Sequence, residues 1–242
     1  MGLGYLGYPL AQDLLKLGHR VKGTTRTPEK KKKFDDEGIV CEILNPSTLP
    51  SKDFLEADVL ILNIPPFEEQ PEWFKSWDWD YSKRIIFVSS TSVYCASSGI
   101  VSEDSKREAG ILSLEEDFFI QHFPSHMILR AGGILGPGRH PGRILSGREN
   151  LSKGNHPVNL IHVDDLRGII LSLIDSENSG VLNVVSDEHH SRKEFYQDFC
   201  KRHGLPLPLF DERDKSEGKT VSNTRLKKSY QLKWPTIFGK DP

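Results

Sequence analysis

The feature that most constrains this chain is residues 1–7, MGLGYLG, which place three glycines in a G-x-G-x-x-G pattern. Apolar residues then recur with helical spacing, which predicts a helix over 9–17. In such a turn the first glycine permits a tight bend, the second lets the backbone approach a pyrophosphate, and the third lets the helix pack on a sheet. The positive end of the helix favours phosphate charge. The pattern therefore predicts a dinucleotide cradle made by Gly2, Gly4, Tyr5, Leu6 and Gly7.

A strand normally leads into this kind of turn, whereas this chain begins at the turn itself. In a doubly wound sheet of order 3-2-1-4-5-6 that strand lies at the centre. Its absence would leave buried backbone groups unpaired, at about 1–3 kcal/mol each. We therefore expect a longer native form that supplies roughly 5–8 apolar residues before Gly2.

The end of the second predicted strand, 19–25, bears on cofactor choice. NAD sites usually carry Asp or Glu about 20 residues after the glycines, to bind the ribose 2′-hydroxyl. This chain has Thr24-Thr25-Arg26-Thr27 there. Because a guanidinium pairs bidentately with a phosphate, Thr25 and Arg26 favour NADP(H) over NAD(H). The alternative is that Arg26 is a solvated turn residue.

Further apolar runs predict the strands of a parallel sheet, and residues at their carboxyl ends are candidates for the same cleft. The runs lie at 39–44, 58–64, 84–88, 127–130 and 181–185, with helices expected at 28–38, 105–123, 166–174 and 191–203. Asp165 is expected to cap the helix that follows it. From the strand ends we predict cofactor contacts at Asn63, Pro65 and Ser89. The fold class is therefore α/β, a Rossmann-type doubly wound parallel sheet.

Residues 89–94, SSTSVY, place several hydroxyls directly after a buried strand. Such hydroxyls can hydrogen-bond a carbonyl or alcohol beside a nicotinamide, so the candidate catalytic residues are Ser90, Thr91 and Tyr94. The alternative is a hydroxyl-rich turn without chemistry. A second loop, 131–139, is rich in glycine and flanked by arginines, which suit an anionic group. It predicts substrate contacts at Arg130, Gly136 and Arg139.

Composition argues against several other classes of protein. The net charge is −2, so no global field attracts nucleic acid or an anionic membrane, and the lysines at 30–33 are expected to be a solvated helix end. Three widely spaced cysteines indicate a reducing compartment, and no run of about 18 apolar residues occurs. We expect a cytoplasmic protein. The histidines lack metal-ligand spacing, so no metal is expected.

Three stretches in this order resemble the atypical and extended short-chain dehydrogenase/reductases, the NAD-dependent epimerase/dehydratase-like family. They are GLGYLG at 2–7, VSSTSVY at 88–94, and LRAGGILGPGR at 129–139 with IHVDD at 161–165. The resemblance spans nearly the whole chain. It implies an NAD(P)-binding Rossmann-like domain over 1–155, with 156–242 adding a further strand and helix and a small substrate lobe in one structural unit. Homodimers are frequent in the family.

The chain departs from this family at the usual proton-transfer pair, Tyr-x-x-x-Lys. No tyrosine here has a lysine four residues later. If the chain is an enzyme, its acid or base must be Tyr94, a residue such as Glu103, or a group of the substrate.

Two functions follow. The first is an NADP(H)-dependent oxidoreductase of the epimerase/dehydratase type that acts on a small polar or sugar-like substrate, with the cofactor supplying the hydride chemistry. The second is a non-catalytic NADP(H)-binding redox sensor or regulator, which the missing Tyr-x-x-x-Lys favours. A remnant that binds no dinucleotide is a third reading.

Overall fold

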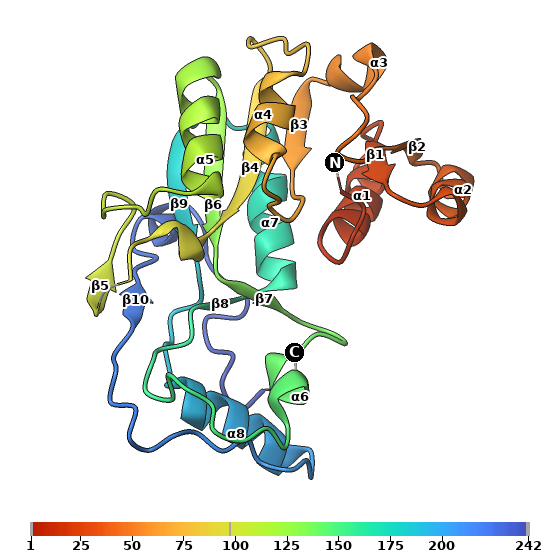
Figure 1. The fold of residues 1–242 in the computed structure, drawn as a ribbon. Helices are drawn as coiled ribbons and strands as arrows, with labels where there is room; N and C mark the ends of the chain where they lie inside the picture. The colour runs from red at the N-terminus through yellow and green to blue at the C-terminus, as the bar shows by residue number, and fades with distance from the viewer. Residues whose placement is uncertain (1, 97, 241–242) are drawn as a thin grey trace. The chain divides into compact units, whose positions relative to one another are not determined.

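The computed structural model describes residues 2–96 and 98–240 and shows an α/β chain (Figure 1). It divides into two compact units. Unit 1 contains the chain up to Ser89, Ala109–Leu129 and Ile170–Val181; unit 2 contains Ser90–Glu108, Arg130–Ile169 and the chain from Leu182 onward. The units interleave along the sequence, so their limits do not coincide with the single boundary predicted after residue 155.

Unit 1 contains most of the helices and strands before residue 130, together with the end of α7 and the start of β9. Its elements, some of which continue into unit 2, are α1 (Gly7–Lys16), β1 (Lys22–Thr25), α2 (Pro28–Asp36), β2 (Val40–Ile43), α3 (Lys52–Leu55), β3 (Val59–Leu62), α4 (Gln70–Lys75), β4 (Arg84–Ser90), α5 (Ile111–His122), β6 (His126–Ala131), α7 (Val163–Ile174) and β9 (Gly180–Val184). The strands predicted from apolar runs are present at the expected places: β2 and β3 are shorter than predicted, β4 and β6 are longer, and β9 is shifted by one residue.

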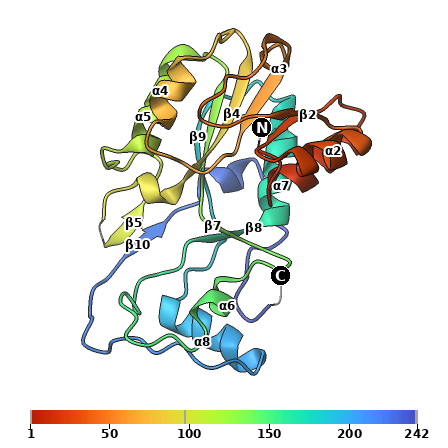
Figure 2. The same ribbon diagram turned by 45° about the vertical axis from the view of Figure 1, so that its right-hand side comes forward.

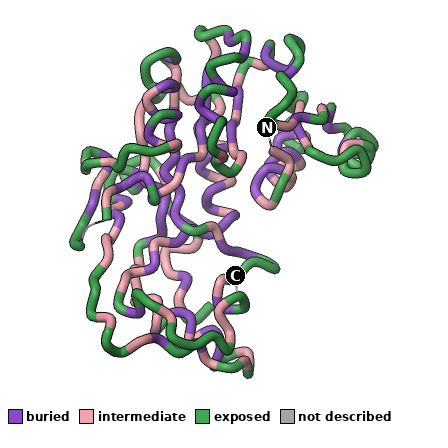
Figure 3. The backbone as a smooth tube through the Cα atoms, viewed as in Figure 1, coloured by how far each residue is buried: buried purple, intermediate pink, exposed green. Residues whose placement is uncertain are grey.

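The described strands of unit 1 form two parallel sheets. One pairs β1 with β2, and the other has the order β3-β4-β6-β9. Helices α4 and α5 lie side by side in both ribbon views (Figures 1 and 2). Trp73 and Phe74 of α4, Phe118 and Phe119 of α5, and Trp77 and Trp79 just after α4 form the main core of the unit with the apolar residues of β3 and β4. The tryptophans are thus packing residues, and Figure 3 shows the strands of this sheet as largely buried.

Helix α5 begins at Ile111, six residues later than the predicted start at Ser105. Residues before it pair as extended backbone instead: Arg107 forms an antiparallel bridge with Tyr94, and the Glu108 N–H donates to the Val93 carbonyl. Pairing within unit 2 has overridden the helix propensity of this charged segment. The predicted helical start was therefore wrong.

Unit 2 consists of short elements joined by long loops. They are a 3₁₀ turn (Thr91–Val93), β5 (Gly99–Val101), β7 (Gly133–Leu135), α6 (Pro141–Leu145), β8 (Leu160–His162), α8 (Arg192–Arg202), β10 (Lys219–Val221) and a second 3₁₀ turn (Leu226–Lys228). Parallel pairs join β5 to β10 and β7 to β8. The loop expected at 131–139 therefore contains a strand.

Asp165 does not cap α7, because the helix begins at Val163 and includes it. Its fully buried carboxylate accepts the backbone N–H groups of Lys233 (2.7 Å) and Trp234 (2.9 Å). Asp165 therefore fastens the C-terminal segment inside unit 2. None of the helices in the described part of the chain is long and apolar enough to cross a membrane.

Candidate functional site

The glycine turn in unit 1 is fixed by contacts with the ends of two strands. The Gly2 N–H donates to Thr24 Oγ1 (2.9 Å), and the Leu3 N–H donates to the Thr24 carbonyl (2.9 Å). On the other side, Asn63 Nδ2 donates to the Gly2 carbonyl (3.1 Å). The turn thus lies where β1 and β3 end, and α1 starts directly after it.

The three glycines have different reasons to be glycine. Gly2 has φ of +76°, a region that disfavours side chains. A Cβ on Gly7 would lie 2.1 Å from the Gly2 carbonyl oxygen, so any side chain there is excluded by the turn itself. A Cβ on Gly4 would meet no atom within 4 Å. Gly4 is therefore not required by the fold, and its bare, exposed backbone is open to a ligand.

The N-terminus of α1 has no side-chain cap, although the Tyr8 N–H donates to the Gly4 carbonyl (3.0 Å). Leu6 stands at the N-cap without a side-chain hydrogen bond, and the first turn contains no acidic residue. The first N–H groups of a helix have no partners inside the helix, and the helix dipole adds partial positive charge there. Together with the open face of Gly4, this makes a fitting seat for a pyrophosphate.

Thr25 and Arg26 lie at the carboxyl end of β1, as predicted. Thr25 is the last residue of the strand, and Arg26 follows it with an exposed side chain. The hydroxyl of Thr25 accepts the Thr27 N–H at 3.5 Å. An exposed guanidinium one residue beyond the strand can reach solvent-borne anions on the same side of unit 1 as the glycine turn.

Asn63 and Pro65 follow β3, with Pro65 exposed. The Asn63 amide is held by its bond to Gly2, yet its Oδ1 is buried without a hydrogen-bond partner in the described residues. Such an unpaired acceptor costs free energy in the absence of a donor. The residues therefore fit a ligand with a hydrogen-bond donor at this point, as an adenosine or nicotinamide moiety would provide.

Ser89, the last residue of unit 1 before the chain enters unit 2, has a different environment from the one predicted. It is buried, and its hydroxyl donates to Glu116 Oε1 at 2.6 Å. Its side chain thus serves an internal bond to α5.

Sequence reasoning missed two buried acids on α5. Glu115 and Glu116 are both almost fully buried, and one oxygen of Glu115 has no partner. Burial and, to a lesser extent, the neighbouring Glu116 raise the pKa of Glu115 to about 8. The signal in the sequence was a run of three acids, 115–117, between apolar residues of the same helix.

The predicted catalytic residues belong to unit 2, where Tyr94 is fully buried. Its hydroxyl donates to Asn183 Oδ1 and accepts from Arg130 Nη1 (3.0 Å). Burial raises the pKa of Tyr94, although Arg130 acts against the rise. A tyrosine base needs the opposite shift and an accessible oxygen. The Ser90 hydroxyl accepts the Ser92 N–H, and Thr91 is buried in the 3₁₀ turn.

The predicted substrate residues differ from one another in environment. Arg130 is only 3% exposed, and its Nη1 also donates to the Glu103 carbonyl (2.9 Å). Gly136 and Arg139 exchange backbone hydrogen bonds in a turn, and the Arg139 side chain is exposed. Of the two arginines, Arg139 is the one at the surface. Within residues 2–96 and 98–240, no group of three or more metal-ligating side chains is gathered.

Comparisons with known proteins agree with this architecture. No family model matches the chain. The human epimerase family protein SDR39U1, solved with NADPH, has a TM-score of 0.66 at 21% identity over 96% of this chain and 93% of that one. The UDP-glucuronic acid 4-epimerase from Bacillus cereus, solved with NAD, has a TM-score of 0.67 at 20% identity over 92% and 88%. The fold is thus that of the epimerase/dehydratase-like short-chain dehydrogenase/reductases.

A sequence relative defines the family more narrowly. Protein YeeZ of Escherichia coli K12 is 32% identical over 250 residues, which cover 93% of this chain and 91% of that protein. This chain belongs to the YeeZ family.

Proposed function

We propose that unit 1 binds a nicotinamide dinucleotide and that the chain is an NADP(H)-dependent oxidoreductase of the epimerase/dehydratase type. The observation that carries the proposal is the glycine turn before the uncapped N-terminus of α1, with Gly4 open to a ligand. The pyrophosphate would lie against Gly4 and the first N–H groups of α1. The orphaned Asn63 Oδ1 would gain a donor. The bound nicotinamide would supply the hydride chemistry.

The preference for NADP(H) rests on Arg26. It is exposed at the end of β1, where NAD-specific sites carry an acid, and its guanidinium would pair with the 2′-phosphate. The proposed substrate is small and polar or sugar-like, and the exposed Arg139 of unit 2 is the candidate for an anionic group on it.

The test of both proposals is a titration with NADPH and NADH in which binding is measured by protein fluorescence. It is performed on the unmodified protein, on Arg26→Ala and on the control Lys75→Ala. Lys75 is a surface cation of unit 1 on α4. We expect Arg26→Ala to weaken NADPH binding by about 10–100-fold and leave NADH binding unchanged. Equal losses for both dinucleotides would refute the role of Arg26, and no binding of either would refute the dinucleotide site.

One observation favours a second candidate, a non-catalytic NADP(H)-binding sensor. Tyr94 is the tyrosine of the SSTSVY segment, and its hydroxyl is hydrogen-bonded to Asn183 and Arg130 inside the protein. A buried, paired hydroxyl is poorly placed to act as a base. Oxidation of NADPH with a panel of small carbonyl substrates distinguishes the two: turnover supports the enzyme, and tight binding without turnover supports the sensor.

A further inference from the structure

Helix α5 of unit 1 carries two carboxyl groups into the core, and stability does not explain them. Glu115 is 1% exposed and Glu116 is 0% exposed. The Ser89 hydroxyl donates to Glu116 Oε1 at 2.6 Å, whereas Glu115 Oε1 has no hydrogen-bond partner among the described residues. Burying a carboxyl group without partners costs free energy. The position of the pair in the fold therefore bears on what it does.

Helices α4 and α5 lie side by side and run in the same direction (Figure 1). Phe74 of α4 contacts Phe119 of α5, with ring centroids 5.3 Å apart. Further along both segments, Trp79 contacts Phe123 at 5.4 Å. Because residue numbers rise together along the contact, residues one turn before Phe74 and Phe119 also lie opposite each other.

The residues one turn before this contact are both polar and both buried. Gln70 lies four residues before Phe74, and Glu115 lies four residues before Phe119, so each shares a helix face with its phenylalanine. Gln70 is 0% exposed, and its Nε2 has no hydrogen-bond partner in the described part of the chain. Helix α4 thus presents a neutral amide to Glu115.

The surroundings of Glu115 favour its protonated form. Burial, and after it the neighbouring Glu116, raise the pKa of Glu115 to about 8. The charged residues of α4, Glu72 and Lys75, are exposed and paired with each other at 2.6 Å, and β4 contributes the hydroxyl of Ser89. Adjacent buried carboxyl groups do not readily carry two negative charges, so the pair holds one proton at neutral pH.

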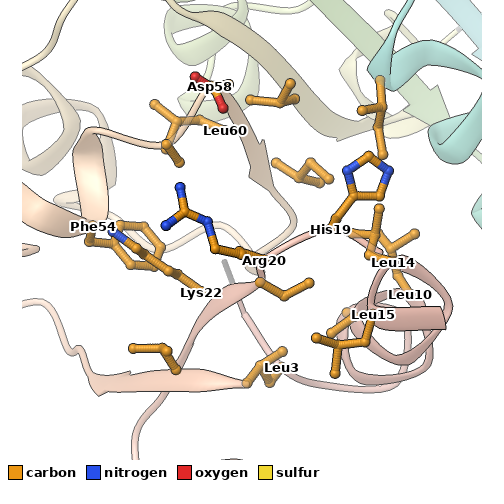
Figure 4. Close-up of a pocket in the computed structure, with 18 of the residues that line it drawn as sticks. Leu3, Leu10, Leu14, Leu15, His19, Arg20, Lys22, Phe54, Asp58 and Leu60 are labelled. Atoms are coloured by element: carbon orange, nitrogen blue, oxygen red, sulfur yellow. The ribbon is translucent and has the colours of Figure 1, made fainter. Parts of the chain in front are cut away.

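The largest described cavity of unit 1 does not reach the pair. It measures about 750 Å³, and Figure 4 shows Leu10 and Leu14 of α1 in its lining together with Leu60 of β3. No described residue of α5 lines it. The proton on the pair is therefore separated from the space in this cavity.

The pair is bonded to the sheet edge that also carries the glycine turn. Strands β3 and β4 are parallel neighbours, and their register, continued by two residues, places Ser89 opposite Ile64. Ile64 directly follows Asn63, whose amide holds the glycine turn. The Ser89 hydroxyl thus connects Glu116 to the strand end beside the proposed cofactor seat.

We propose that Glu115 and Glu116 form an internal proton store that takes the place of the missing Tyr-x-x-x-Lys pair, with Ser89 passing the proton on. This inference rests on the proposed oxidoreductase function. Reduction of a carbonyl adds a hydride, supplied by the bound cofactor, to its carbon and requires one proton at its oxygen. Ser89 gives that proton and regains one from Glu116, which is refilled by Glu115. The store is left as two carboxylates and takes one proton back from water.

The store is tested first without any dinucleotide, so this result does not depend on the proposed function. Carbon-13 NMR of protein labelled at the glutamate carboxyls follows their titration in the unmodified protein, in Glu115→Gln and in the exposed control Glu69→Gln. We expect one glutamate to titrate near pH 8 in the unmodified protein and the control, and this signal to be missing from Glu115→Gln. If every glutamate of the unmodified protein titrates below about pH 6, the inference is overturned.

Delivery of the proton is tested by NADPH oxidation with a panel of small carbonyl substrates at several pH values. We expect the kcat of the unmodified protein to fall above about pH 8. Glu115→Gln and Ser89→Ala should lower kcat about 10²–10⁴-fold and remove this fall, with the affinity for NADPH unchanged. A purely structural role of Glu115 would leave the pH profile as it is. A Glu115→Gln protein that matches the Glu69→Gln control in kcat and pH profile would overturn the inference.

Failure of the inference is distinguishable from failure of the proposed function. Turnover that is unaffected in Glu115→Gln overturns only the role of the proton store. Tight NADPH binding without reduction of any carbonyl refutes the oxidoreductase and the delivery step together, and the NMR titration still decides whether the pair holds a proton.

Discussion

Arg26 of unit 1 and Arg130 of unit 2 lie in opposite environments. In unit 1 the polar groups of the glycine turn stand at strand ends, with Arg26 exposed and Gly4 open. In unit 2 Arg130 is 3% exposed and holds the Tyr94 hydroxyl and the Glu103 carbonyl. The exposed guanidinium of Arg26 can bind a ligand. The guanidinium of Arg130 instead donates its hydrogen bonds to groups inside the protein and stabilises the fold. Residue type alone does not separate these roles.

The largest expected effect tests this contrast between the arginines. Arg130→Ala should lower the free energy of unfolding by about 3–5 kcal/mol, because it leaves buried oxygen acceptors without their donor. Arg26→Ala should change it by less than about 0.5 kcal/mol. Urea unfolding of both variants measures the difference. Similar losses in the two variants would contradict the comparison.

A second pair of variants separates two glycines of the same turn. Gly7→Ala should cost about 2–4 kcal/mol of stability, because its Cβ would lie 2.1 Å from the Gly2 carbonyl oxygen. Gly4→Ala has open space around its Cβ, so it should keep the native Tm and weaken dinucleotide binding by at least about tenfold. Calorimetry and cofactor titration measure the two effects. Normal dinucleotide binding by Gly4→Ala would show that Gly4 does not contact the cofactor.

Two buried glutamates, one in each unit, differ in whether their carboxylate oxygens have hydrogen-bond partners. In unit 2, Glu103 Oε1 accepts the Asn183 N–H at 2.9 Å, whereas Glu115 of unit 1 has an oxygen without a partner.

The Glu115 carboxyl has a pKa of about 8 in the folded protein and an ordinary, lower one when unfolded. At a pH between these two values the carboxyl is ionised in the unfolded chain but still protonated in the folded protein. The free energy of unfolding should therefore be highest at low pH and fall as the pH rises toward 8. Glu115→Gln should remove most of this fall, and the exposed control Glu69→Gln should not. Unfolding measured from pH 5 to pH 8.5 decides, and an unchanged pH profile would contradict the assignment.

The smallest expected effect concerns Tyr94. Removing its hydroxyl in Tyr94→Phe should cost about 1–2 kcal/mol, because Asn183 and Arg130 each lose a buried partner. The exposed control Tyr81→Phe should cost nothing measurable. If Tyr94→Phe instead keeps full stability and abolishes turnover, the hydroxyl acts in the chemistry.

Local patterns in the sequence were sufficient for the frame of unit 1. The runs at 58–64 and 84–88 predicted strands that are found at Val59–Leu62 and Arg84–Ser90. The glycine spacing predicted a turn followed by α1. Strands, turns and helix starts depend mainly on residues close together in the chain, so the spacing of apolar residues and glycines is enough to predict them.

Only the tertiary structure decided which polar side chains are enclosed. Tyr94 and Asn183 are 89 residues apart, and Asp165 holds backbone N–H groups 68 and 69 residues away. A hydroxyl or carboxylate in the sequence carries no mark of such distant partners. The sequence by itself therefore determined the fold class, the family and the place of the glycine turn. The folded chain decided that Tyr94 and Arg130 are interior groups and that Arg26 is not, because burial and hydrogen-bond pairing depend on contacts between distant segments.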